Sequence, residues 1–266
     1  MKLSFCLFLL VLIPGLMHAQ DYAIKQLEES PRHHEWVELT SNDRTLYSFV
    51  AYPEREDESP VVIVIHENRG LNDWARSFTD QLAAEGFIAI APDLLSQSAT
   101  GVEKTTDFET SDDARKAIYA LDADRVTNDL VAITEYAKTL EAGNGKVVVI
   151  GFCWGGSQSF RFATNAGDRI EAAIVCYGTA PKETTSFESI EVPVFGLYGG
   201  ADNRVNATIP ATEKAMNSYD KTYEYEIYDG AGHAFFRRGD NPDEQGPNKL
   251  ARDKGWEKIL EILKNQ

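Results

Sequence analysis

The sequence of 266 residues contains 42 aspartates and glutamates against 26 lysines and arginines, a formal net charge of −16 at pH 7. Such an acidic surface repels the phosphate backbone of nucleic acids and the head groups of anionic membranes, so both are excluded as partners. The composition therefore indicates a soluble protein whose partner is a small molecule.

The first 19 residues have the layout of a secretory signal peptide. Lys2 supplies a basic start, residues 3–16 form an apolar run that Pro14 interrupts, and the small residue Ala19 precedes a cleavage point. A buried N-terminal helix is the alternative, and these flanks argue against it. We therefore expect an exported protein, periplasmic or secreted, with no stable membrane insertion after cleavage and enough chain for one α/β domain.

Three cysteines occur in the chain, and Cys6 belongs to the predicted signal peptide. The two that remain, Cys153 and Cys176, are too few for a disulfide scaffold, although they could form one disulfide. Cys176 ends the apolar run 170–175, which favours packing in the core. Redox chemistry between the two thiols is a separate hypothesis, weakened by the absence of a Cys-x-x-Cys motif.

Residues 20–32 are charged, and we expect them to form a mobile arm. The segments 35–39 and 45–52 have the residue types of strands on either side of a polar turn, which predicts an antiparallel hairpin at one edge of a sheet. His33 and His34 at its start would point to opposite faces of a strand, so we interpret them as surface residues rather than metal ligands.

From residue 61 onward the chain alternates between predicted strands and helices. The run 61–65 is apolar without alternation, typical of a central strand covered on both faces. The further segments are helices at 71–85, 111–121, 125–142, 208–218 and 247–264, and strands at 87–91, 146–150, 170–177, 192–198 and 222–228. This order predicts an α/β fold for a single domain over 33–266, with a doubly wound, mostly parallel sheet and helices on both faces. The polar stretch 96–113 is expected to overhang the site as a loop or lid.

The strand predicted at 146–150 leads into Gly151-Phe152-Cys153-Trp154-Gly155-Gly156, and residues at helical spacing follow. A strand, a tight turn and a helix around Gly-x-Cys-x-Gly match the nucleophile elbow of α/β hydrolases, where glycines let backbone and helix pass close to the nucleophile. Cys153 would be that nucleophile, because a thiolate attacks carbonyl carbon. An inert buried cysteine is the alternative.

A cysteine nucleophile needs a base within reach and a third group that holds the base. Asp202 follows two glycines after the strand 192–198, and His233 lies in a glycine-rich segment after the strand 222–228. The chain order Cys153, Asp202, His233 matches nucleophile, acid and base in hydrolases of this architecture. These three residues are the predicted catalytic set.

The oxyanion of the transition state must be met by backbone N–H groups. We expect one N–H from Trp154, the residue after the nucleophile, and the other from the loop 66–70, at Asn68. Glu67 in that loop could place its carboxylate against the thiol, with a surface acid as the alternative. His66 ends an apolar strand, which favours a hydrogen-bonded structural role.

Taken together, residues from about 30 to 264 resemble the dienelactone hydrolase (carboxymethylenebutenolidase) family of the α/β-hydrolase superfamily. The resemblance implies that Cys153 attacks an enol-lactone or ester carbonyl, that His233 moves protons and that Asp202 orients His233. It also implies that Glu67 interacts with the resting thiol until substrate displaces it, and that no metal or organic cofactor is used. The matching motifs are His66-Glu67-Asn68-Arg69-Gly70-Leu71, Ala91-Pro92-Asp93-Leu94, Gly151-Phe152-Cys153-Trp154-Gly155-Gly156, Gly199-Gly200-Ala201-Asp202 and Gly230-Ala231-Gly232-His233-Ala234-Phe235.

The resemblance also bears on the substrate. Family members that open dienelactones bind the substrate carboxylate with two arginines, and Arg237 matches one of them. The other belongs in the loop after Leu94, where this chain has Gln97, so an anionic dienelactone would lose a charge-assisted contact of about 1.5–3 kcal/mol.

The leading hypothesis is therefore an exported thiol hydrolase, a monomer or weak dimer, acting on a lactone or small carboxylic ester through a thioacyl-enzyme. The alternative is a non-catalytic protein that binds a small molecule on the same scaffold. A pure binder would not need the set Cys153, Asp202 and His233.

Overall fold

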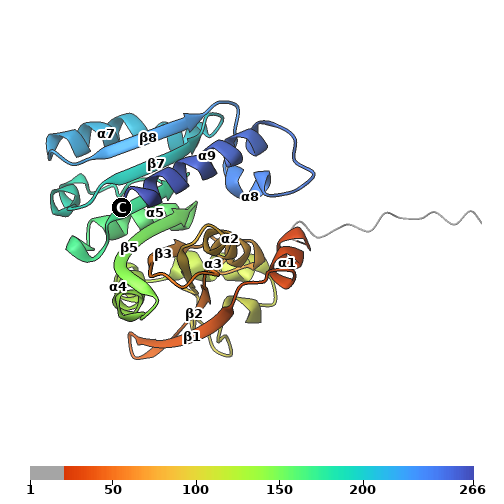
Figure 1. The fold of residues 1–266 in the computed structure, drawn as a ribbon. Helices are drawn as coiled ribbons and strands as arrows, with labels where there is room; N and C mark the ends of the chain where they lie inside the picture. Colours follow the sequence, from red (N-terminus) through yellow and green to blue (C-terminus); the bar gives the residue numbers. More distant parts are fainter. Residues whose placement is uncertain (1–20) are drawn as a thin grey trace, which may run out of the picture.

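A computed structural model describes residues 21–266, and the predicted signal peptide lies outside this range. Its centre is one eight-stranded sheet with the order β1-β2-β4-β3-β5-β6-β7-β8, in which the hairpin and β8 occupy opposite edges (Figure 1). β2 pairs antiparallel with β1 and β4, and all other neighbours are parallel. The strands are β1 (His34–Ser41), β2 (Arg44–Ala51), β3 (Ser59–Ile65), β4 (Ile88–Pro92), β5 (Gly143–Phe152), β6 (Ala172–Cys176), β7 (Val194–Gly199) and β8 (Tyr223–Tyr228).

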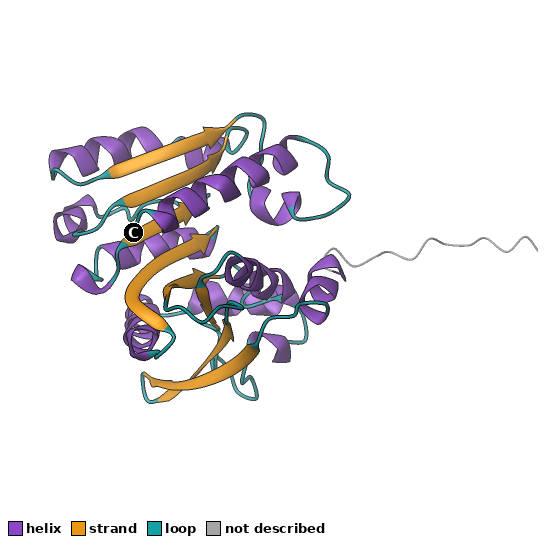
Figure 2. Ribbon diagram, in the orientation of Figure 1, coloured by secondary structure: helices purple, strands orange, loops and turns teal. Residues whose placement is uncertain are grey.

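Helices cover both faces of this sheet, which Figure 2 shows as a twisted layer of strands between them. One face packs against α1, α2, α8 and α9, and the other against α4, α5 and α7. The fold is therefore the predicted doubly wound α/β fold. The helices are α1 (Asp21–Glu28), α2 (Asp73–Ala84), α3 (Ser111–Ala120), α4 (Ala123–Thr139), α5 (Trp154–Ala163), α6 (Asn203–Asn206), α7 (Ile209–Ser218), α8 (Phe235–Gly239) and α9 (Pro247–Lys264).

The surroundings of the central strand β3 explain why residues 61–65 are all apolar. Its alternate side chains enter different cores: Val62 and Val64 face the core of α2 and α9, whereas Val61 and Ile63 face the core of α4 and α5. All four side chains are fully buried. Because both faces are covered, neither can be polar, and the parallel neighbours hold the ends of β3, β5, β7 and β8 at one edge of the sheet.

The N-terminal segment corrects one sequence prediction. Residues 21–28 form helix α1 instead of part of a mobile arm, and Ala23 is fully buried. The buried carboxylate of Asp80 on α2 accepts hydrogen bonds from Ser30 Oγ at 2.7 Å and Arg32 Nε at 2.7 Å, and His34 Nε2 lies 2.7 Å away. A buried charge needs partners. Ser30 and Arg32, which the sequence suggested were part of a mobile arm, and His34, which it suggested was on the surface, are the partners of Asp80.

The stretch 96–113, expected to be a loop or lid, is anchored to the domain at its centre. A short 3₁₀ turn covers Thr105–Asp107, and α3 begins at Ser111. The buried Asp93 carboxylate at the end of β4 accepts the Thr105 backbone N–H at 2.6 Å and its hydroxyl at 2.7 Å. Through this anchor the segment delivers α3 to the edge of the sheet where the parallel strands end.

Candidate active site

Cys153 lies at the sharp junction between β5, which ends at Phe152, and α5, which begins at Trp154. Its backbone has φ 54° and ψ −112°, a left-handed conformation that is unfavourable for any residue with a side chain. The surrounding structure maintains this strain: the Cys153 N–H donates to the carbonyl oxygen of Cys176 on β6 at 3.0 Å. The predicted nucleophile elbow is therefore present in its geometry.

Two glycines in the first turn of α5 allow this junction to form. A Cβ added to Gly155 would lie 2.3 Å from the carbonyl oxygens of Ile65 and His66 on the β3 side. A Cβ added to Gly156 would lie 2.6 Å from the carbonyl oxygen of Cys176. Both distances are far below a van der Waals contact, so only glycine lets α5 approach the two neighbouring strands this closely.

The three predicted catalytic side chains meet at the carboxyl ends of β5, β7 and β8. His233 Nε2 lies 3.1 Å from Cys153 Sγ, and His233 Nδ1 lies 2.5 Å from Asp202 Oδ2. Because a carboxylate only accepts, Nδ1–H donates to Asp202, which leaves Nε2 to accept the thiol proton. Asp202 is itself held by the Val205 N–H at 3.3 Å. This is the arrangement in which a thiol, an imidazole and a carboxylate could act as nucleophile, base and orienting acid.

The thiol is uncharged in the resting molecule. Burial raises the pKa of Cys153 to about 11, and the nearby Glu67 carboxylate adds to that rise. The backbone N–H of Trp154 and the positive charges of Arg204 and Arg237 act in the opposite direction and lower the pKa. A reaction at this thiol would therefore first have to remove its proton, and His233 Nε2 is the acceptor in contact with it.

Glu67 follows β3 and is 6% exposed. Its Oε2 accepts a hydrogen bond from Arg237 Nε at 2.7 Å, and its Oε1 accepts one from the Tyr177 hydroxyl at 3.3 Å. The Glu67 carboxylate is thus hydrogen-bonded to Arg237 and Tyr177, and it acts on the Cys153 thiol through its charge. The ion pair with Glu67 occupies Arg237, the residue expected to bind a substrate carboxylate.

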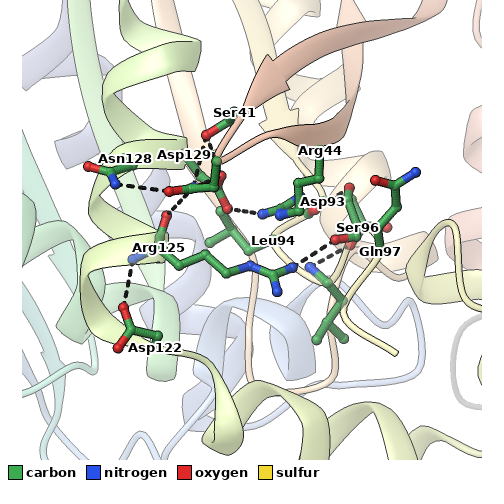
Figure 3. A network of polar contacts seen from close by, with 12 residues as sticks. Ser41, Arg44, Asp93, Leu94, Ser96, Gln97, Asp122, Arg125, Asn128 and Asp129 are labelled. Atoms are coloured by element: carbon green, nitrogen blue, oxygen red, sulfur yellow. Dashed lines mark hydrogen bonds and ion pairs between the residues drawn. The ribbon is translucent and has the colours of Figure 1, made fainter. Parts of the chain in front are cut away.

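Gln97 lies apart from this site, in the loop after β4. Its side-chain oxygen accepts a hydrogen bond from the Thr45 backbone N–H at 2.9 Å, at the tip of the hairpin. Figure 3 shows it beside Ser96, whose carbonyl oxygen accepts from Arg125 Nη2 at 2.8 Å in a network around the buried Asp129. The expected substrate contact at Gln97 is not met by this geometry, because its side chain secures the loop to the hairpin.

The two oxyanion-hole candidates differ in how they are placed. The Trp154 N–H is directed at Cys153 Sγ from the first residue of α5. Asn68 donates its side-chain amide to the Tyr119 hydroxyl at 3.1 Å, which ties the loop after β3 to α3. Trp154 therefore lies next to Cys153, whereas Asn68 is connected to the pocket through Tyr119, one of its lining residues.

His66 is buried and holds that loop in place. Its Nδ1 lies 2.8 Å from the Glu67 carbonyl oxygen, and its Nε2 accepts from the Leu94 N–H at 3.3 Å. The imidazole stacks on the Trp154 ring with centroids 5.8 Å apart. Burial lowers the pKa of His66 to about 4, so it is neutral at physiological pH, in agreement with the structural role predicted for it.

A pocket of about 200 Å³ opens at Cys153 Sγ. Sequence reasoning identified two of its eight lining residues, Cys153 and Trp154, and missed the other six, among them Tyr119, Tyr177 and Arg204. Tyr177 follows β6 at the same strand edge and lies 5.1 Å from the His233 ring, centroid to centroid, and this position was the signal that could have identified it. Arg204 lies two residues after Asp202, also near the end of a strand, so the same position could have identified it. Tyr119, in helix α3, had no such signal. The lining consists of Tyr119, Cys153, Trp154, Ser157, Tyr177, Gly178, Thr179 and Arg204.

Within residues 21–266 no group of three metal-binding side chains occurs, and no helix has the length and apolar character needed to cross a membrane. Both cysteines of this range are free thiols. Cys176 is fully buried in β6, as its apolar surroundings predicted.

Comparison with known proteins gives a consistent result. A model of the dienelactone hydrolase family matches residues 46–266. A Saccharolobus solfataricus protein named "Putative carboxymethylenebutenolidase" is 30% identical over 253 residues, covering 84% of this chain and 95% of that protein. A protein of the same name from Escherichia coli K12 is 27% identical over 242 residues, 86% of each chain.

The fold has solved counterparts as well. The crystal structure of a "Putative Dienelactone Hydrolase" from Klebsiella pneumoniae superposes with a TM-score of 0.77 and covers 88% of this chain and 99% of that one. At 23% identity, this similarity supports the fold alone.

Proposed function

Because this chain belongs to the dienelactone hydrolase family and is thus a hydrolase of ester bonds, we propose that Cys153 is its nucleophile, with His233 as base and Asp202 as the orienting acid. One observation carries the proposal. Cys153 Sγ, the His233 imidazole and the Asp202 carboxylate form a continuous line of contacts at 3.1 and 2.5 Å, on a strained elbow that presents the sulfur to a pocket.

The reaction follows from this line of contacts. The thiol proton moves to His233 Nε2 as Sγ attacks the carbonyl carbon, and the oxyanion is met by the Trp154 N–H and by the loop at Asn68. The ester C–O bond breaks, and the alcohol leaves with the proton from Nε2. Water then gives a proton to Nε2 and attacks the thioacyl carbon, and the C–S bond breaks as the thiol is restored. Asp202 stabilises the imidazolium in both halves.

The proposed substrate is a lactone or a small carboxylic ester. The pocket of about 200 Å³ is smaller than the ~300–1,000 Å³ of sites for drug-sized ligands, which favours a short acyl group. The relatives named for carboxymethylenebutenolidase activity support a lactone in particular. We further propose that the protein is exported and acts in the periplasm or outside the cell, on the strength of the signal-peptide pattern in residues 1–19.

Replacing the nucleophile tests the proposal. Cys153→Ala is expected to reduce hydrolysis of para-nitrophenyl acetate and of a neutral lactone by about 10⁴-fold or more, because the covalent route is lost. Cys176→Ala is the matched control: its thiol is buried away from the pocket, so turnover should persist. Near-normal turnover by a folded Cys153→Ala protein would refute the mechanism. No turnover by either wild type or control would favour the binding-protein alternative.

A further inference from the structure

The two positions expected to bind a substrate carboxylate do not perform that task in this structure. Arg237 is paired with the buried carboxylate of Glu67 at 2.7 Å, so its guanidinium is already engaged by an acidic partner. Gln97 is uncharged and hydrogen-bonded to the hairpin. If the site recognises an anionic group, another residue must supply the positive charge.

Arg204 is a cation that lines the pocket at Cys153. It lies in the four-residue helix α6, two positions after the catalytic Asp202, and its side chain is exposed. The guanidinium makes no ion pair or hydrogen bond with any part of the described chain 21–266. Its charge nevertheless reaches the nucleophile, since it lowers the pKa of the Cys153 thiol. In a protein of net charge −16, with 42 acidic residues, an arginine beside the site with no acidic partner among the described residues stands out.

Two hydroxyls that line the same pocket as Arg204, those of Ser157 and Thr179, leave one proton for a ligand. Ser157 Oγ accepts the Thr179 backbone N–H at 2.8 Å, and the two side-chain oxygens lie 3.2 Å apart. Only one hydroxyl can donate across that contact, so the proton of the other is available to an acceptor in the pocket. The remaining walls are the aromatic rings of Tyr119, Trp154 and Tyr177.

A carboxylate is the group that these donors fit. The guanidinium presents paired N–H donors in the geometry of a carboxylate, and a neighbouring hydroxyl can add a third hydrogen bond. We propose that Arg204 is the specificity-determining residue of this site and binds a carboxylate carried by the ester or lactone substrate. This inference rests on the proposed function, because it requires that the pocket at Cys153 bind the substrate.

Two matched substrate pairs test this inference. In the first, the carboxylate is on the acyl group: para-nitrophenyl hemisuccinate is compared with the neutral, similarly shaped para-nitrophenyl isocaproate. In the second, it is on the leaving group: the acetate ester of para-hydroxybenzoate is compared with that of para-hydroxybenzamide. For each pair the measured quantity is the ratio of kcat/KM, anionic over neutral, after subtraction of the rate with Cys153→Ala. The ratio cancels any effect of Arg204 on the thiol that all substrates share.

Arg204→Gln is expected to lower this ratio by about 10-fold for at least one pair, mainly through a higher KM for the anion, as the loss of an exposed charge-assisted hydrogen bond predicts. Arg204→Lys should retain part of the preference because it keeps the charge. Arg169→Gln, which removes an equal charge in the turn before β6 where Arg169 pairs with Glu135, is the control.

The outcomes separate the two proposals. Equal ratios in Arg204→Gln and Arg169→Gln, for both pairs, would overturn the role of Arg204 while cysteine-dependent turnover leaves the mechanism standing. A fall in the ratio of the same size in Arg169→Gln would also overturn it, since the preference would then reflect net charge. Turnover that survives in Cys153→Ala would instead refute the mechanism.

Discussion

At the scale of single residues, the site keeps the Cys153 thiol, the proposed nucleophile, in its protonated form. Glu67 lies close enough to Cys153 to raise the pKa of the thiol by its charge, and it simultaneously pairs with Arg237, whose charge would lower that pKa. A substrate group that drew Arg237 or Glu67 away would change this balance. The ion pair therefore contributes to the charge balance that keeps the thiol protonated.

The first prediction concerns this charge balance. Glu67→Gln should lower the pKa of Cys153, because it removes a negative charge and frees the positive charge of Arg237. At pH 8 a fall of one unit gives about 10 times more thiolate, so alkylation by iodoacetamide should be about 10-fold faster. Cys153→Ala measures the background from the buried Cys176. An unchanged rate in Glu67→Gln would show that burial alone keeps the thiol protonated.

The three residues of the proposed catalytic set could be brought together from sequence for a topological reason. Cys153, Asp202 and His233 lie at or shortly after the ends of β5, β7 and β8, and parallel strands bring such positions to one end of the sheet. The partner of Glu67 was not predictable, because thiol and guanidinium both lie within its reach and the choice depends on burial. Tyr119 was hidden as well, since it is an exposed residue of a helix.

At the scale of elements, the buried Asp80 links α2 to the segment that leads from α1 into β1. Arg32, Ser30 and His34 all converge on this one carboxylate. The sequence did not predict this arrangement. Asp80 matched the polar face of an ordinary helix, and its partners lie more than 40 positions earlier in the chain. Strands and long helices, in contrast, are fixed by local apolar patterns and were placed to within a few residues.

A second prediction follows for stability. Asp80→Ala leaves Arg32 without its partner, so the free energy of unfolding should fall by about 3 kcal/mol, as for other buried ion pairs that lose one member. Asp73→Ala, in the first turn of the same helix, removes a more exposed carboxylate paired with Arg76 and should cost less than about 1 kcal/mol. Urea unfolding measures both variants. Similar losses in the two would mean that Asp80 is not an anchor.

At the scale of the whole molecule, 42 acidic residues against 26 basic ones mean that the negative charges repel one another in the compact folded state. Many carboxylates are locally neutralised, as Asp80 is by Arg32, Glu67 by Arg237 and Asp240 by Arg252. Those pairs are partly buried and weakly screened by salt, whereas the unpaired surface charges are strongly screened.

The third prediction is therefore that salt stabilises this protein. Raising NaCl from about 10 mM to about 150 mM shortens the screening length from about 30 Å to about 8 Å, which weakens repulsion between distant carboxylates more than it weakens buried pairs. Thermal unfolding followed by circular dichroism should show a higher Tm in the salt buffer. A lower Tm would indicate that attractive surface pairs outweigh the repulsion.

The contact between α1 and α8 has a consequence for the order in which the chain is made. The Tyr22 hydroxyl donates to the carbonyl oxygen of Arg237 at 3.0 Å, across 215 positions of sequence. At the ~5–20 residues per second of protein synthesis, roughly 10 to 40 s separate the two residues as they leave the ribosome. The segment that pairs with α1 therefore reaches it only when nearly all of the chain has been made, and Cys153 is synthesised before His233 and Arg237, so the site is assembled only near the end of elongation.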